Sequence, residues 1–109
     1  MARYRPGEIV LLRFPFADAV GAKRRPALVM LDVDDDDIVV SRVTSQACQT
    51  PFDVEVSAWQ EAGLLLPSVV RLHKLATLEK GLVERRLGAL NHDDWQQVRS
   101  RVLELWSSI

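Results

Sequence analysis

GEIVLLRF, at residues 7–14, is the stretch from which the fold of this chain can be worked out. The glycine is followed by β-branched and apolar residues, a composition that favours a β-strand. Apolar side chains stand at both odd and even positions and so fall on both faces, which predicts a strand that is central or covered on both sides. Pro15 weakens any continuation, because proline cannot donate a ladder hydrogen bond.

Further strand-like segments follow at short intervals, separated by turn residues. Pro26 opens the second segment, and four aspartates at residues 34–37 make a tight connection to the third. These aspartates could hold a cation, but aspartate favours turns and metal ligands usually come from more than one segment, so we interpret them as a solvated hairpin turn. We expect a loop at residues 17–24 and strands at residues 27–33, 38–44, 52–56, 68–78 and, more briefly, 85–90.

Two segments have helical character. Residues 57–62 can form one or two helical turns, which Gly63 would close. The last segment predicts a longer helix near residues 92–106, with Asn91 as its cap and two aspartates in the first turn, where the helix dipole favours negative charge. Its apolar residues share one helical face, which we expect to pack against the strands: Trp95, Val98, Val102 and Leu105.

The chain, residues 1–109, is long enough for one domain, and we expect a single mainly β domain. Five or six short antiparallel strands with one C-terminal amphipathic helix are typical of a small barrel. No apolar run approaches the roughly 18–20 residues of a membrane span, and the N-terminal residues lack the apolar core of a secretory signal. The single cysteine, Cys48, cannot form a disulfide within the chain, which fits a cytoplasmic protein.

Several classes of function are disfavoured by charge and motif content. The formal net charge of −1 argues against a long nucleic-acid track and for a short recognition site. His73 and His92 lie far apart and the cysteine lies near neither, so there is no zinc-ligand pattern, and we expect no metal and no cofactor. Cys48 could act as a nucleophile if folding brought a histidine to it, but a small inert thiol is the simpler interpretation.

Short motifs occur in a fixed order along the chain: GEIV at 7–10, RPALVM at 25–30, VTSQ at 43–46, SVVR at 68–71 with LATL at 75–78, and RLG at 86–88. In this order and spacing, followed by a terminal helix, they resemble the PemK/MazF-like toxins of bacterial type II toxin–antitoxin systems. The resemblance runs from about Arg5 to Trp106. It implies an SH3-like barrel that forms a homodimer, cleaves single-stranded RNA without a metal, and is inhibited by a cognate antitoxin protein.

Metal-free RNA cleavage needs a base for the 2′-hydroxyl, a charge that stabilises the phosphorane, and an acid for the leaving 5′-oxygen. The expected products are a 2′,3′-cyclic phosphate and a 5′-hydroxyl. The resemblance makes Arg25 catalytic, and its fixed charge suits the phosphorane. It also makes Thr44 catalytic, as a threonine beside that arginine that hydrogen-bonds the phosphate. Taken without the resemblance, Arg25 is a surface arginine on a hairpin and Thr44 an ordinary β-branched strand residue.

Arg71 and His73 complete the expected catalytic group. They lie two residues apart on a predicted strand, so their side chains should share a face. One branch of the resembling family uses an arginine and an aspartate at this spacing as acid and base. Here a histidine takes the aspartate position, and histidine can exchange protons near neutral pH. The alternative is a partly exposed strand histidine with an arginine neighbour. Which of Arg25, Arg71 and His73 is acid or base stays open.

Residues beside the catalytic candidates are expected to bind RNA. They are the rest of the basic cluster, Lys23 and Arg24, and the two residues that follow the threonine, Ser45 and Gln46. Ala76 departs from the resembling family, because many members carry an arginine there. This chain therefore lacks one phosphate contact or one structural salt bridge that the resemblance would imply.

Two other functions compete with an endoribonuclease. The first is a non-catalytic SH3-like barrel that binds and inhibits a protein target such as a topoisomerase, and the second is a degenerate, inactive toxin homologue. Trp59, Trp95 and Trp106 could stack on RNA bases, although their helical context favours core or dimer contacts for the last two. The RNA cleavage sequence and the identity of the antitoxin do not follow from the sequence.

Overall fold

The computed structural model describes residues 2–14 and 23–109, and this part of the chain is mainly β, as predicted. The elements in chain order are β1 (Glu8–Phe14), β2 (Lys23–Leu31), β3 (Asp37–Thr44), β4 (Asp53–Glu55), β5 (Val69–Glu79), the short 3-10 helix η1 (Lys80–Leu82), β6 (Val83–Ala89) and α1 (His92–Ser107). Each expected strand is present, with bounds close to those predicted. The loop expected at residues 17–24 lies outside the described residues, except for its last two residues, which belong to β2 because they pair with β1.

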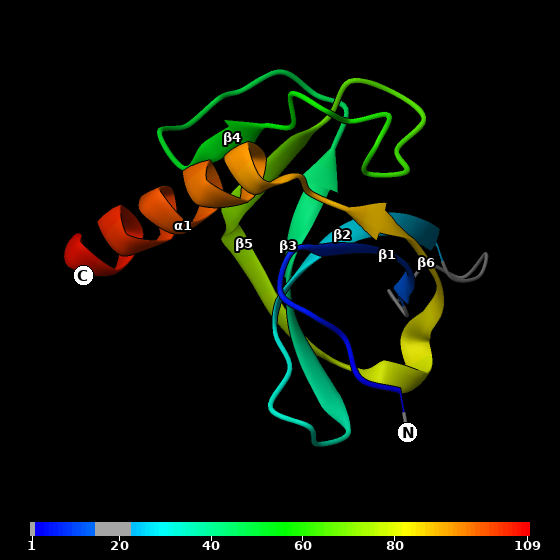
Figure 1. Cartoon of the computed structure of the whole chain (residues 1–109). Coiled ribbons are helices and arrows are strands. Elements are labelled where there is room, and N and C mark those ends of the chain that lie inside the picture. Colours follow the sequence, from blue (N-terminus) through cyan, green and yellow to red (C-terminus); the bar gives the residue numbers. More distant parts are fainter. Residues whose placement is uncertain (1, 15–22) are drawn as a thin grey trace.

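The strands form one antiparallel sheet in the order β4–β5–β3–β2–β1–β6 (Figure 1). Figure 1 shows that the sheet is strongly curved and that α1 lies across its β4–β5 end. The predicted closed barrel is not found, because β4 and β6 are both edge strands in the described chain.

A turn segment occupies the place where a strand would have to pair with β6 to close the sheet. A Cβ added to Gly63 would lie 2.0 Å from the carbonyl oxygen of Leu87, and one added to Gly88 would lie 2.5 Å from the carbonyl oxygen of Ala62. The two backbones therefore touch without side chains between them. β4 itself is three residues long and pairs with β5. The sheet consequently stays open, with its β6 edge covered by a turn.

The short helix predicted at residues 57–62 is instead a series of turns. One helix-type hydrogen bond forms, from Ala62 N to Ala58 O at 3.1 Å, but the next amide, that of Gly63, donates to Gln60 O. Gly63 has a φ of 84°, which is the left-handed conformation in which helices commonly end. The predicted stop is correct, but the segment ends before helical hydrogen bonding can propagate.

Apolar side chains are buried on both faces of the central strands. In β1, Ile9 belongs to a cluster that includes Val98 of α1, whereas Val10 and Leu12 belong to a second cluster on the opposite face. All three β1 side chains are fully buried. This confirms the prediction that the 7–14 segment forms a strand covered on both sides.

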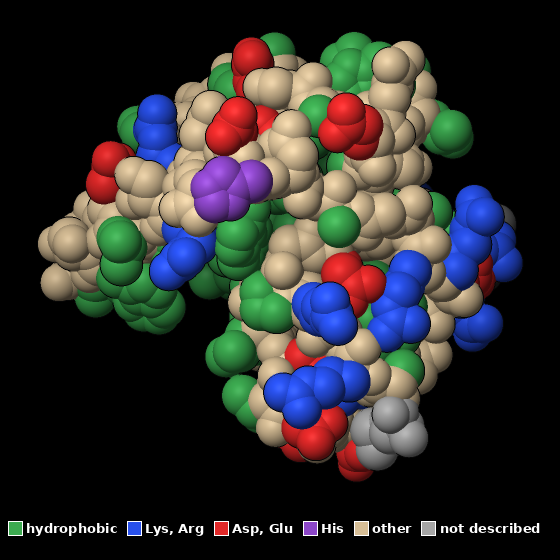
Figure 2. All heavy atoms as spheres, viewed as in Figure 1, with side chains coloured by type: hydrophobic (Ala, Val, Ile, Leu, Met, Phe, Trp, Pro, Cys, Tyr) green, Lys and Arg blue, Asp and Glu red, His purple; other side chains and the backbone are tan. Residues whose placement is uncertain are grey.

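α1 begins and ends close to its predicted bounds. The side chain of Asn91 accepts a hydrogen bond from Asp94 N at 2.8 Å and so caps the helix as expected. Val98 is fully buried, and the rest of the predicted inner face, Trp95, Val102 and Leu105, packs against the same cluster. The C-terminal end projects past the sheet, and Figure 2 shows hydrophobic side chains gathered beneath it. Exposed apolar residues there are Leu103, Trp106 and Ile109.

Among residues 2–14 and 23–109, no helix is both long and apolar enough to cross a membrane. The three exposed apolar residues of the projecting end belong to α1 and the two residues that follow it. Trp106 is 60% exposed and so is not part of the core that the described residues form.

The β2–β3 connection is the solvated hairpin turn predicted from its aspartates. Residues 34–36 are exposed, and Asp34 has a φ of 70°. The preceding Asp32 is buried, accepts hydrogen bonds from Tyr4 N and Asp34 N at 2.8 Å, and pairs with Lys80 at 3.0 Å. The Tyr4 N–H contributes most to lowering the pKa of Asp32 to about 2, in spite of the opposing effect of burial. This carboxylate fastens the N-terminal segment and η1 to the hairpin.

Candidate functional site

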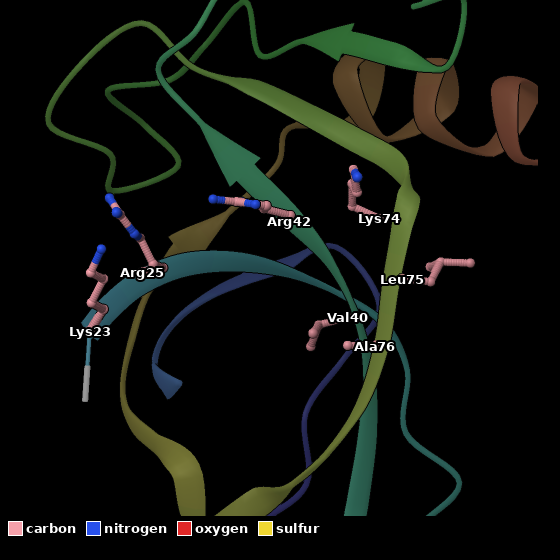
Figure 3. A pocket seen from close by; sticks show the side chains of 7 residues that line it. All are labelled: Lys23, Arg25, Val40, Arg42, Lys74, Leu75 and Ala76. Atoms are coloured by element: carbon pink, nitrogen blue, oxygen red, sulfur yellow. The ribbon is translucent and has the colours of Figure 1, made fainter. Parts of the chain in front are cut away.

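Four basic side chains from three strands surround one cavity of about 290 Å³, which we call the basic pocket. Lys23 and Arg25 come from β2, Arg42 from β3 and Lys74 from β5. Figure 3 shows Arg42 reaching from β3 toward Arg25. Every charged residue that lines the basic pocket in the described part of the chain is a cation. The lining is completed by Val40, Leu75 and Ala76.

Strand alternation explains why basic side chains of two strands meet at this pocket. Lys23 and Arg25 precede Ala27 at two-residue spacing on β2, so the three side chains share a face. Ala27 lies directly opposite Arg42 in the antiparallel pairing of β2 with β3. Side chains directly opposite in such a pair point to the same side of the sheet. The register therefore places the β2 and β3 cations together.

Arg24 lies apart from the other members of the predicted basic cluster, Lys23 and Arg25. It alternates to the other face of β2, and its Nε lies 2.8 Å from both carboxylate oxygens of Glu84 in β6. Its charge is therefore neutralised locally. The cluster predicted at residues 23–25 contributes Lys23 and Arg25, but not Arg24, to the basic pocket.

The electrostatic character of the basic pocket is strongly positive. Arg25, Arg42 and Lys74 are exposed, and none of their side chains forms a hydrogen bond or ion pair with another residue that the structure describes. Like charges gathered around one cavity raise the local concentration of anions. Guanidinium groups offer paired N–H donors that match the oxygens of a phosphate. The basic pocket is therefore suited to binding a phosphate group.

Ala76 forms part of the floor of the basic pocket. It lies opposite Val40 in the pairing of β5 with β3, and both residues line the cavity. An arginine at this position, as the resemblance led us to expect, would therefore have added a cation to the pocket. In this chain Arg42 and Lys74 supply positive charge to the same cavity.

A second cavity, of about 380 Å³, lies beside the loop that follows β3, and we call it the loop pocket. Ser45 and Gln46, both predicted to bind RNA, line it together with Trp59 and Glu55. The lining thus combines an aromatic ring with a hydroxyl, an amide and a carboxylate. Thr44 stands at the base of this loop, where its Oγ1 accepts a hydrogen bond from Gln46 N at 3.2 Å.

Arg25 and Thr44 lie at the same end of neighbouring strands. The pairing of β2 with β3 stops at Ala27 and Arg42. Carried two residues further in the same register, it would place Arg25 opposite Thr44. The two strands thus bring both predicted catalytic residues to the end of the sheet where the loop pocket begins.

Arg71 stands next to an irregularity in β5, and His73 lies within it. The pairing of β5 with β3 skips residues 72–74, so regular alternation, on which the expected common face rested, does not hold there. Arg71 is 7% exposed, whereas His73 is exposed to solvent. The two side chains therefore have different environments.

Arg71 is held by two polar groups. Its Nη1 lies 3.0 Å from Asp53 Oδ2, and its Nη2 donates to Gln46 Oε1 at 3.1 Å. Burial raises the pKa of Asp53, but the N–H groups of Gln49 and Thr50 and the charge of Arg71 together lower it by more. Asp53 is therefore ionised at neutral pH and forms a buried ion pair with Arg71.

The structure brings some of the predicted site residues together and separates others. Lys23 and Arg25 share the basic pocket. Gln46 lines the loop pocket and also contacts Arg71, so these two predicted residues are linked. His73 lines neither of these two cavities, although it directly precedes Lys74 of the basic pocket.

Four charged residues of the site were not predicted from the sequence: Arg42, Lys74, Asp53 and, in the lining of the loop pocket, Glu55. Arg42 could have been found, since it stands two residues before Thr44 and so shares its strand face. Lys74 reaches the basic pocket from the irregular part of β5, which the sequence does not reveal. No sequence pattern near Asp53 indicates that it belongs to the site, because its partner Arg71 is 18 residues away.

Metal-binding chemistry is not evident in the described chain. No group of three or more histidine, cysteine, aspartate or glutamate side chains there is arranged to hold a metal ion. Cys48 is exposed in the loop after β3. The described polar side chains at the two pockets are therefore cations, hydroxyls, an amide and one carboxylate.

Solved structures with a similar fold cover nearly the whole chain. An endoribonuclease in complex with its cognate antitoxin from a mycobacterial species has a TM-score of 0.78 at 16% identity, over 97% of this chain and 96% of that chain. MazF (Form-I) from Deinococcus radiodurans has a TM-score of 0.71 at 27% identity, over 93% and 94%. MazE–MazF (Form-II) from the same organism has a TM-score of 0.70 at 26% identity, over 92% and 91%.

Sequence comparison agrees with the structural similarity. No protein with a curated description matched the sequence. The model of the family described as PemK-like, MazF-like toxin of type II toxin–antitoxin system matches residues 5–106. Because this match covers nearly the whole chain, the protein belongs to the PemK-like, MazF-like toxins of type II toxin–antitoxin systems.

Proposed function

We propose that this toxin is an endoribonuclease that cleaves single-stranded RNA at specific sequences. The observation that carries the proposal is the basic pocket, where Arg25, Arg42 and Lys74 face one cavity without an ion-pair partner among the described residues. An RNA phosphate is an anion that such a pocket suits. Membership of the toxin family and the similarity to solved endoribonucleases support the same activity.

The proposed reaction is an intramolecular transesterification that uses no metal ion. The 2′-oxygen attacks the adjacent phosphorus, the bond from phosphorus to the 5′-oxygen breaks, and the products carry a 2′,3′-cyclic phosphate and a 5′-hydroxyl. Arg25 stabilises the phosphorane, and Arg42 supplies a second positive charge at the same cavity. Thr44 donates its hydroxyl hydrogen to a phosphate oxygen.

His73 is the proposed proton-transfer residue of this reaction. It is exposed and directly precedes Lys74, a lining residue of the basic pocket. An imidazole can accept the proton of the 2′-hydroxyl or deliver one to the 5′-oxygen near neutral pH. Replacement of His73 by alanine should therefore reduce kcat more than it raises KM.

The loop pocket is the proposed site for a base next to the scissile phosphate. Trp59 offers an aromatic surface on which a base can stack. Ser45 and Gln46 offer a hydroxyl and an amide that can hydrogen-bond the edge of an unstacked base. Recognition of single-stranded RNA commonly uses this combination, so the loop pocket would contribute to sequence preference.

We also propose two protein partners. Solved structures of similar toxins contain a cognate antitoxin, and we expect one here whose acidic segment covers the basic pocket. The second partner is another copy of this chain. A homodimer would cover the exposed apolar side chains at the end of α1, and the toxin would act in the cytoplasm, where its RNA substrate lies.

RNA cleavage by the purified protein tests the proposed activity. Wild type should cleave a panel of single-stranded RNAs in excess EDTA and leave the two ends named above. Arg25→Ala should lower kcat/KM by about 100-fold or more, as loss of a transition-state charge contact does. Arg24→Ala is the matched control, because this neighbouring arginine is paired with Glu84, and it should cleave at close to the wild-type rate.

Two outcomes would reject the proposed activity. One is the absence of cleavage across the panel at pH values on both sides of the range in which histidine titrates. The other is growth inhibition that survives both Arg25→Ala and His73→Ala, which would support a non-catalytic module that inhibits a protein target.

A further inference from the structure

The loop between β3 and β4 forms one wall of the loop pocket but has no strand or helix of its own. One carboxylate organises its backbone. Asp53 Oδ2 accepts hydrogen bonds from Gln49 N at 2.8 Å and from Thr50 N at 3.1 Å. The conformation of this loop therefore depends on what fixes the side chain of Asp53.

Arg71 fixes Asp53 and at the same time reaches the pocket-lining part of the loop. Asp53 and Arg71 are directly opposite in the pairing of β4 with β5, and Nη1 lies 3.0 Å from Oδ2. The other terminal nitrogen, Nη2, donates to Gln46 Oε1 at 3.1 Å. The backbone N–H of Gln46 in turn donates to Thr44 Oγ1. A single guanidinium thus connects two strands with a residue of the loop pocket.

Because Arg71 is buried, its guanidinium cannot easily leave these contacts. The side chains of Arg71 and Asp53 are 8% and 0% exposed, respectively. Removing one member of such a pair leaves an uncompensated charge in the interior, so the pair resists separation. A phosphate that approached Arg71 would have to displace Gln46 or compete with Asp53. Arg25, Arg42 and Lys74 of the basic pocket have no such competing partner in the described chain.

We propose that Arg71 is a positioning residue of the RNA site, which acts through Gln46, and that Asp53 is its anchor. The Asp53–Arg71 pair holds the loop after β3 in the conformation that presents Ser45 and Gln46 to an RNA base. This inference rests on the proposed function and assigns Arg71 to substrate recognition, while the phosphate chemistry belongs to Arg25 and His73.

Positioning makes a specific kinetic prediction. Loss of a loop contact weakens substrate binding in the ground and transition states alike, which raises KM and leaves kcat nearly unchanged. Direct contact between Arg71 and the phosphorane would instead lower kcat. Because Arg71 acts through Gln46, the effects of removing the two side chains should not multiply.

A double-mutant cycle on RNA cleavage tests this inference with Arg71→Lys, Gln46→Ala and the double variant. Lysine keeps the charge opposite Asp53 but cannot also offer the second nitrogen that reaches Gln46, so the variant should remain folded. We expect each single variant to raise KM by about tenfold with kcat close to wild type, and the double variant to match the single variants. Arg24→Ala is the control, because it also removes an arginine that forms an ion pair, in this case with Glu84 and away from the loop pocket.

Two kinetic results would overturn the positioning role. The first is a kcat that falls by about 100-fold in Arg71→Lys, whether or not Gln46 is present, since this would indicate direct chemistry. The second is a double variant whose KM is the product of the two single effects, since independent contributions would multiply.

Amide hydrogen exchange gives a readout that does not depend on cleavage. The amides of Gln49 and Thr50 should be protected in wild type and exchange at least about tenfold faster in Arg71→Met, while those of β1 remain unchanged. Unchanged exchange at Gln49 and Thr50 would refute the anchoring role of the pair. If these amides behave as expected but wild type cleaves no RNA, the proposed function fails while the anchoring of the loop stands.

Discussion

Replacing Arg42 with alanine should weaken RNA binding and make it less sensitive to salt. When a protein binds single-stranded nucleic acid, the logarithm of the association constant falls linearly with the logarithm of the salt concentration. Each neutralised phosphate makes this slope more negative by about 0.7. The basic pocket holds three cations without ion-pair partners among the described residues. If each neutralises one phosphate, the slope is about −2.1 for wild type and about −1.4 for Arg42→Ala. From roughly 50 to roughly 200 mM KCl, affinity should then fall about 18-fold in wild type and about 7-fold in the variant.

Fluorescence anisotropy of a short labelled RNA measures these slopes directly. The RNA carries 2′-O-methyl groups, so it lacks the hydroxyl nucleophile and remains intact during the titration. Arg24→Ala is the matched control, because it removes the same charge from the same strand, but that charge is already paired with Glu84. Its slope should equal that of wild type.

Either of two results would refute this reasoning. A slope that is unchanged in Arg42→Ala would mean that the cation neutralises no phosphate. A slope that falls equally in Arg42→Ala and Arg24→Ala would mean that general surface charge, rather than the basic pocket, controls binding.

Three further predictions concern folding and assembly. Gly63→Ala should lower the free energy of unfolding by more than about 2 kcal/mol in urea titrations, since φ is 84° and the added Cβ would lie 2.0 Å from a carbonyl oxygen. Gly81→Ala is the control, because a Cβ there meets nothing within 4 Å, and it should leave the free energy of unfolding nearly unchanged. The pKa of Asp32 is lowered from 3.8 to about 2, mainly by the Tyr4 N–H, so the ionised carboxylate stabilises the fold above about pH 4 and this stabilisation is lost as pH falls toward 2. In Asp32→Asn the dependence of Tm on pH should therefore become flatter between pH 4 and pH 2, and a dependence equal to that of wild type would contradict this. Trp106→Glu should shift the sedimentation coefficient from dimer to monomer, and a dimer that persists would place the interface elsewhere.

Local sequence patterns were sufficient to predict the strands and α1. The mixed apolar run of β1 predicted burial on both faces, and Asn91 marked the start of α1, because each signal depends on residues a few positions apart. Closure of the sheet was predicted wrongly. It depends on what meets β6, and the tight contact between Gly63 and Gly88 joins residues that are distant in the sequence.

The candidate site was only partly predictable for the same reason. The sequence identified the basic cluster that contains Arg25, but it could not show that Arg24 would pair with Glu84 of β6. The expectation of a common face for Arg71 and His73 assumed a regular strand. The pairing of β5 with β3 is interrupted at residues 72–74, which include His73, so the strand is not regular there.

The sequence by itself determined the family, the mainly β class, the C-terminal helix and the basic character of the start of β2, since motif order, strand periodicity and helix capping are local properties. The tertiary structure decided which charges are available to RNA. Pairing across strands neutralises Arg24, buries Arg71 against Asp53, and leaves Arg25, Arg42 and Lys74 around one cavity. The physical reason is that the function of a charge depends on its nearest opposite charge and its exposure, and both are set by strand register.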